Sequence, residues 1–282
     1  MKTAILMFTA AVATAVPAAA QQPGPTAYFQ AAGAVKAEYA AAERRLAADE
    51  RQAPAALPAD RAALAMEEFK LKQAQDAFQD SMTDALDLVS DTINGDRAAL
   101  NAAVSNLKAA AHSLDVLVAG WSMDKAPAAL SGVVAAQSEF NRAAEKYAID
   151  VYRAAKMPPS QEFWHKIAIV DAASAQVFVA LAALQPASAE PPKPGEAAPP
   201  ADKGVQPEAE AVAAAKALAA AADARYRAAW ERYDLAALNP AWQDIRAAQA
   251  ELTRSEEAYL AASQKTPWER PAAPPPPLSG LF

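Results

Sequence analysis

Apolar side chains recur every three or four residues along most of this chain, which is the period of an amphipathic α-helix. The clearest series consists of Leu100, Val104, Leu107, Ala111, Leu114, Val118 and Trp121. A second series follows Pro127 and comprises Leu130, Val133, Gln137, Phe140, Ala144, Tyr147 and Val151. A third follows Ser160 and comprises Phe163, Ile167, Val170, Ser174, Val177, Leu181 and Leu184. Three successive amphipathic helices joined by short breaks predict an antiparallel bundle.

Two further helices are predicted upstream of these series. One runs from about Thr26 to Arg51, and a longer one runs from Asp60 to Asn94. The next helix is predicted to open at Asp96, directly after Gly95. A helix of roughly 35 residues reaches about 50 Å at 1.5 Å per residue. The molecule is therefore expected to be elongated.

The composition changes sharply after the third series. Residues 185–207 are rich in proline, alanine, glutamate and lysine, which is typical of an extended linker. Residues 208–265 predict a helical hairpin whose second helix starts at Asn239 and Pro240, and residues 266–282 predict a proline-rich, disordered tail. We therefore expect an all-α protein: an elongated antiparallel bundle with coiled-coil-like packing over 21–184, joined by the linker to a C-terminal hairpin. The sequence leaves open whether the hairpin packs on the bundle.

The first twenty residues have the pattern of a cleavable signal peptide. Lys2 precedes an apolar stretch of about 13 residues, which is shorter than the roughly 20 residues of a membrane span. Pro17 and the run Ala18–Ala20 then predict cleavage before Gln21. The chain has no cysteine, so it is not expected to be a lipoprotein or to form disulfides. These features predict a periplasmic or secreted protein without a transmembrane span in its mature form.

Composition and charge narrow the classes of partner. Hydrophobic residues make up 53% of the chain, but many are alanines, which favour closely packed helices over a thick interior. The formal charge is −7, and it would become −8 once Lys2 is removed with the leader. This balance argues against nucleic acid as a partner, because binding phosphates requires clustered Lys and Arg.

Residues suited to catalysis or metal binding are scarce. Only two histidines exist, His112 and His165. Glu162 and His165 have the three-residue spacing of carboxylate-bridged metal bundles, but a second such pair is missing, because the residue three before His112 is Ala109. We expect no catalytic site, no metal and no cofactor.

Two surfaces are candidates for binding a partner. The first is a row of aspartates spaced by three or four residues, which helical geometry confines to an arc of about 80°. This acidic ridge consists of Asp76, Asp80, Asp84, Asp87 and Asp91. Its simplest interpretation is a solvated face that aids solubility, and the alternative is a face that docks a basic partner or cations. The second is the tail, a polyproline segment that could dock in a groove or stay idle, and its candidate residues are Arg270, Pro271, Pro274, Leu281 and Phe282.

These expectations favour a non-enzymatic helical scaffold or protein-interaction module of the cell envelope. Its partners would be envelope proteins, and homo-oligomerisation stays open. The alternative is a periplasmic bundle whose interior binds a small apolar ligand or haem.

Overall fold

The structure is a computed structural model that describes residues 23–186, 204–273 and 276–282. These residues form seven α-helices and two short 3₁₀ helices, with no strand among them. The α-helices are α1 (Pro25–Gln52), α2 (Leu57–Asp87), α3 (Ser90–Ala119), α4 (Ala126–Ala155), α5 (Gln161–Ala182), α6 (Gln206–Glu231) and α7 (Leu235–Ser263). The 3₁₀ helices are η1 (Pro54–Ala56) and η2 (Leu278–Leu281). The all-α class predicted from the apolar periodicity is confirmed.

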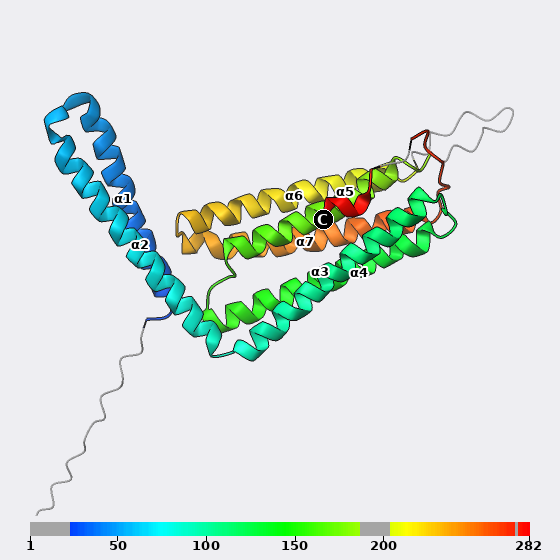
Figure 1. The fold of residues 1–282 in the computed structure, drawn as a ribbon, viewed down its shortest axis with the longest axis horizontal. Coiled ribbons are helices and arrows are strands. Elements are labelled where there is room, and N and C mark those ends of the chain that lie inside the picture. The colour runs from blue at the N-terminus through cyan, green and yellow to red at the C-terminus, as the bar shows by residue number, and fades with distance from the viewer. Residues whose placement is uncertain (1–22, 187–203, 274–275) are drawn as a thin grey trace, which may run out of the picture.

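Helices α3 to α7 lie along the long axis of the molecule and form the bundle (Figure 1). Each of them runs antiparallel to the next helix of the chain. Helix α3 pairs with α4 and α6 pairs with α7, while α5 packs on both α6 and α7, and α4 also contacts α7. The C-terminal hairpin, whose position the sequence left open, is therefore part of the bundle.

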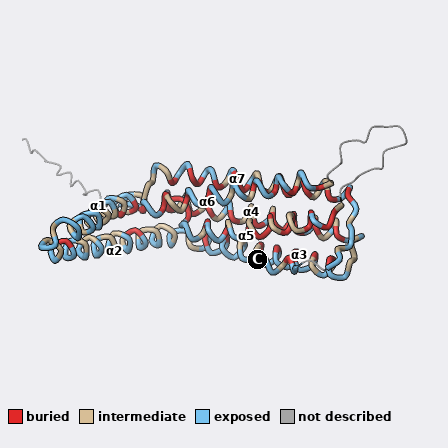
Figure 2. Tube along the Cα trace, turned by 90° about the horizontal axis from the view of Figure 1, so that it is seen from above, coloured by how far each residue is buried: buried red, intermediate tan, exposed pale blue. Residues whose placement is uncertain are grey.

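The apolar series meet inside the bundle. Leu107 and Leu114 of α3, Leu130 of α4, and Phe178 of α5 are fully buried, and Leu252 of α7 is almost so. Burying a side chain of this size stabilises the fold by roughly 1.5–3 kcal/mol before conformational entropy is counted. Figure 2 shows the buried residues on the inward sides of these helices.

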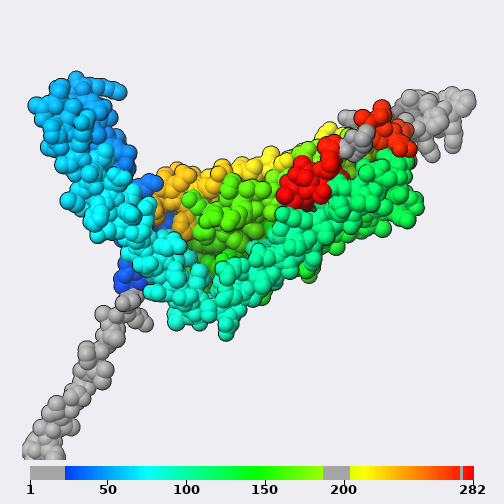
Figure 3. Space-filling view, viewed as in Figure 1, coloured from blue at the N-terminus to red at the C-terminus, as the bar shows by residue number. Residues whose placement is uncertain are grey.

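Helices α1 and α2 form a different unit, an antiparallel hairpin that projects from one end of the bundle (Figures 1 and 3). We call this hairpin the arm. Its large buried side chains, Phe29 and Phe78, lie where it meets the bundle, and most of the rest of the arm is exposed (Figure 2).

The structure corrects one predicted helix boundary in the first half of the chain. The helix expected from Asp60 to Asn94 ends at Asp87, and α3 begins at Ser90 and runs straight through Gly95. The break falls at Leu88 and Val89, where Val89 leaves the helical region with φ −130° and ψ 29°. Asp96 does not cap a helix, because its side chain is buried and forms an ion pair with Lys146.

Two cap predictions have different outcomes. Ser160 caps α5 as predicted, since its hydroxyl accepts a hydrogen bond from the Phe163 N–H at 3.3 Å. The start of α7 at Asn239 and Pro240 is wrong. Asp234 caps this helix by accepting from the Ala237 N–H at 3.0 Å, and Pro240 lies inside the helix.

Most of the proline-rich linker lies outside the described residues. The tail differs from the disordered segment predicted for it, because the described part lies on the bundle. The Glu269 N–H donates to the Leu184 carbonyl at 2.9 Å, and Leu278 of η2 is buried. Figure 3 shows η2 against α3 and α5.

Helix α5 is long and apolar enough to cross a membrane on length and composition alone. The absence of a transmembrane span from the mature chain stays a prediction. Half of its most apolar stretch is buried in the bundle, as expected for a helix at the centre of a fold. Among the described helices no other meets the criterion.

Candidate functional site

Four aromatic side chains fix the arm to the bundle, and we call them the aromatic root. The ring centroid of Phe29 lies 5.4 Å from that of Phe78 on the other helix of the arm. The same ring lies 5.0 Å from both Trp230 and Tyr233, at the end of α6. A Cβ added to Gly33 would lie only 2.9 Å from the Tyr233 Cβ, so α1 packs very closely on this turn. The arm therefore leaves the bundle from a packed contact.

A hollow of about 380 Å³ opens beside the aromatic root. Helix α2 contributes Phe78, Met82 and Leu86 to its lining. Helices α4 and α5 contribute Tyr147 and Phe163, whose rings stack with their centroids 4.7 Å apart. All of these except Phe78 are only half-buried, so this junction hollow presents apolar side chains to solvent.

The acidic ridge lies on the same helix as one wall of the junction hollow. Its first four residues, Asp76, Asp80, Asp84 and Asp87, are exposed on α2. Asp91 is also exposed but belongs to the first turn of α3, beyond the helix break. The predicted arc therefore holds for four aspartates on one helix, and the structure does not place the fifth on that helix.

The break between α2 and α3 exposes large apolar side chains next to the ridge. Leu88 is 87% exposed, more than any other large hydrophobic residue described, and Val89 is exposed as well. Leu88 and Val89 are two and three residues after Leu86, which lines the junction hollow. An exposed apolar group rimmed by charge is the usual composition of a protein-binding surface.

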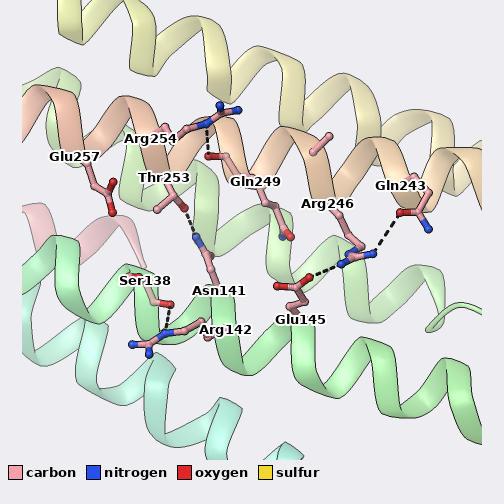
Figure 4. A pocket seen from close by; sticks show the side chains of 12 residues that line it. Ser138, Asn141, Arg142, Glu145, Gln243, Arg246, Gln249, Thr253, Arg254 and Glu257 are labelled. Carbon is pink, nitrogen blue, oxygen red and sulfur yellow. Dashed lines mark hydrogen bonds and ion pairs between the residues drawn. The ribbon is translucent and has the colours of Figure 1, made fainter.

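A second hollow, of about 610 Å³, lies between α4 and α7 and is polar (Figure 4). Arg246 of α7 forms an ion pair with Glu145 of α4 across this groove. Asn141 Nδ2 also crosses it, donating to Thr253 Oγ1 at 2.5 Å. These contacts join α4 to α7.

Asn141 also belongs to a cluster of hydrogen-bonded polar side chains that is buried between three helices. Gln137 Nε2 donates to Asn141 Oδ1 at 3.2 Å and to Asp171 Oδ1 at 2.8 Å. Gln249 Nε2 donates to the other oxygen, Asp171 Oδ2, at 3.0 Å. Glu256 completes the cluster and accepts from the Ser174 hydroxyl at 3.1 Å. The cluster thus ties α4, α5 and α7 together in the bundle interior.

Both carboxyl groups of the cluster are hard to ionise. Burial raises the pKa of Asp171 to about 7, although the hydrogen bonds from Gln249 and Gln137 favour its charged form. Burial also raises the pKa of Glu256 well above its usual value, and the nearby charge of Asp171 raises it further. A buried carboxyl that carries a proton near neutral pH can donate a hydrogen bond as well as accept one. The cluster therefore suits a structural role that sets the register of three helices.

The histidines do not join this cluster. His165 Nδ1 lies 3.6 Å from Asp223 Oδ2 at the surface, and His112 is exposed on α3. Glu162 forms an ion pair with Lys166 at 2.8 Å, one turn along its own helix. The described residues contain no group of three His, Cys, Asp or Glu side chains that could hold a metal ion.

The candidate tail residues lie apart from these sites. Arg270 is exposed and Pro271 is half-buried, while Pro274 lies outside the described residues. Leu281 is exposed and Phe282 packs against the bundle core. As a ligand for another protein the tail stays a prediction.

Sequence reasoning missed both the junction hollow and the buried polar cluster. For the cluster a signal existed, since Gln137 and Ser174 occupy positions within otherwise apolar series. A polar residue at such a position predicts a buried hydrogen bond. For the hollow no such signal existed, because its lining comes from separate helices.

Comparisons with known proteins identify no relative of this chain. No protein-family model matches the chain, and neither the curated proteins nor the solved structures give a match.

Proposed function

We propose that this protein is a non-enzymatic helical scaffold or protein-interaction module of the cell envelope, and that the arm contacts its partner. The observation that carries the proposal is the projecting arm itself. Its helices are 28 and 31 residues long, yet the buried residues of α2 number only two, Asp60 and Phe78. A helix pair that buries so little has its side chains available for contacts with another protein.

Exposed apolar side chains on the arm support this proposal. Met66 and Phe69 are each 56% exposed on α2. Phe69 also lines an open hollow of about 710 Å³ with Tyr39 and Leu71. Large aromatic and thioether side chains are enriched at the centres of protein interfaces.

The compartment in this proposal rests on the leader pattern of residues 1–20, which lie outside the described residues. Amino-terminal sequencing of protein isolated from cells is expected to begin at Gln21. An intact Met1 in the protein from the cell envelope would contradict it.

Site-specific photo-crosslinking in living cells tests the arm as the contact surface. A photoreactive amino acid in place of Met66 or Phe69 is expected to form adducts with another protein. The same substitution at Leu218 on α6 is the control, because Leu218 is 58% exposed but belongs to the bundle. Absence of adducts from the arm, or equal adducts from Leu218, would contradict the proposal.

The alternative function, binding of an apolar ligand or haem inside the bundle, gains less support. The α4–α7 groove is polar, and both histidines stand at or near the surface. The absorbance spectrum of the purified protein tests this alternative directly, since a haem would give a strong band in the visible range.

A further inference from the structure

We infer that the junction hollow is the docking site for a basic, amphipathic segment of a partner protein, which inserts an apolar side chain into the hollow and sets Lys or Arg against the acidic ridge. This inference rests on the proposed function and names the site and chemistry of the partner. It follows from three observations: a hollow that is open to solvent and has several apolar side chains in its walls, a charge of one sign beside it, and a fixed geometry between the two.

The hollow is suited to an apolar anchor. Its volume of about 380 Å³ lies within the range of roughly 300–1,000 Å³ typical of binding pockets. Met82 and Leu86 are flexible aliphatic walls, and the stacked Tyr147 and Phe163 are rigid aromatic ones. A few well-buried contacts usually carry most of the binding energy of an interface. Leu88, at the end of α2, is a further exposed apolar side chain two residues after Leu86.

The charge beside the hollow has one sign. No Lys or Arg occurs in the sequence between Lys72 and Arg97, whereas this stretch contains all five aspartates of the ridge. Two basic side chains across the junction form ion pairs: Lys146 pairs with Asp96 and Asp150, and Lys166 pairs with Glu162. The ridge is therefore the negatively charged surface beside the hollow, and a partner with complementary charge is basic.

Helical geometry puts the ridge at the edge of the hollow. At 100° per residue, Gln79 and Thr83 lie on α2 between its apolar wall and the ridge, and both line the hollow. Asp80, Asp84 and Asp87 each come one residue, or about 100° around the helix, after the hollow-lining residues Gln79, Thr83 and Leu86, so they lie outside the hollow on the neighbouring face of α2. A helix lying in the hollow would present its basic side chains to these carboxylates at intervals of one turn.

Direct binding to the full mature chain tests the inference. The probe is a fluorescein-labelled helical peptide of about 18 residues, or about five turns, with Lys on one face and Leu around a single Trp on the other. Fluorescence anisotropy is expected to show binding that weakens between about 50 and 200 mM salt, because exposed charges are screened. A peptide with Glu in place of every Lys is expected not to bind.

Two triple variants distinguish an effect of the ridge carboxylates from an effect of the net charge of the protein. The triple variant Asp80→Asn, Asp84→Asn, Asp87→Asn is expected to weaken binding about tenfold or more and to flatten the salt dependence. The control Asp124→Asn, Glu210→Gln, Glu257→Gln removes the same charge from exposed positions elsewhere and is expected to change binding by less than about twofold. Equal losses in both variants would overturn the inference, because binding would then follow net charge alone.

Leu88→Ser tests the apolar component without endangering the fold, since Leu88 packs against little. It is expected to weaken binding of the Lys peptide severalfold. Unchanged binding in this variant and in Met82→Asp would overturn the apolar anchor. Self-association of the chain in sedimentation, abolished by Leu88→Ser and competed by the peptide, would identify a second copy as the occupant and would also overturn the inference.

The outcomes also separate this inference from the proposed function. Crosslinks from Phe69 without binding of the Lys peptide would leave the arm as a contact surface and remove the junction hollow as its docking site. Binding of the Lys peptide without crosslinks from the arm would contradict the proposed function in cells.

Discussion

The bundle and the arm are made of the same kind of alanine-rich helix, yet they bury very different shares of their residues. In α4, 11 of 30 residues are buried, whereas in α2 the number is two of 31. A helix of the bundle such as α7 packs on α4, α5 and α6, while in the arm α1 and α2 pack mainly on each other. The same local pattern therefore yields a stable core in one region and an exposed surface in the other. Burial by neighbours, which periodicity alone does not specify, sets this difference.

The largest expected difference is in stability. Phe140→Ala removes a fully buried ring from the bundle and is expected to lower the free energy of unfolding by about 3–5 kcal/mol. Phe69→Ala removes a ring of the same size from the arm, and the expected change is within about 0.5 kcal/mol. Urea denaturation of both variants is the measurement. Similar losses would show that the arm is as tightly packed as the bundle.

The buried polar cluster makes the stability of the bundle depend on pH. The pKa of Asp171 is raised to about 7 in the fold, so the folded chain keeps a proton that the unfolded chain releases above about pH 4. Stability should therefore fall as the pH rises from about 4 to 7, by about 4 kcal/mol at most for Asp171, and then level off. Glu256 is expected to extend the fall to higher pH.

The variant Asp171→Asn tests this dependence, since it keeps the shape of the side chain and cannot ionise. Over the same pH range, the urea midpoint of this variant should change less with pH than that of the unaltered protein. Asp124→Asn, at an exposed position, is the control and should leave the slope unchanged. A slope that persists in Asp171→Asn would assign the effect to other groups.

The sequence predicted the fold class well because the apolar series of the bundle are regular. It failed where a contact between distant segments decided the outcome. Asp96 looked like a helix start, but it pairs with Lys146 fifty residues away, and the helix passes through it. The acidic ridge was visible because its residues share one helix. The junction hollow was not visible, because α2, α4 and α5 build it together.

The aromatic root should respond more moderately than the bundle core. Gly33→Ala would place a Cβ 2.9 Å from the Tyr233 Cβ and 3.1 Å from its carbonyl oxygen, so α1 must shift. We expect the free energy of local unfolding of α1 to fall by about 1–3 kcal/mol. Amide hydrogen exchange should therefore become faster in α1 and stay unchanged in α4. Gly132→Ala is the control, because nothing lies within 4 Å of its added Cβ; it should stabilise by about 0.5–1 kcal/mol. Protection of α1 unchanged in Gly33→Ala would contradict the packed root.

The smallest expected effect lies in the tail, which, like the arm, is peripheral. The Asp115 carboxylate accepts from the Leu278 N–H at 2.5 Å and from the Ser279 N–H at 2.7 Å. Asp115→Asn replaces one of these acceptor oxygens by a donor and should weaken the attachment of η2 by about 1–2 kcal/mol. Hydrogen exchange of those two amides should accelerate while the urea midpoint of the bundle stays nearly constant. A matching drop in the bundle's midpoint would mean that the tail is part of the core, and the comparison would then leave the arm as the single peripheral unit among the described residues.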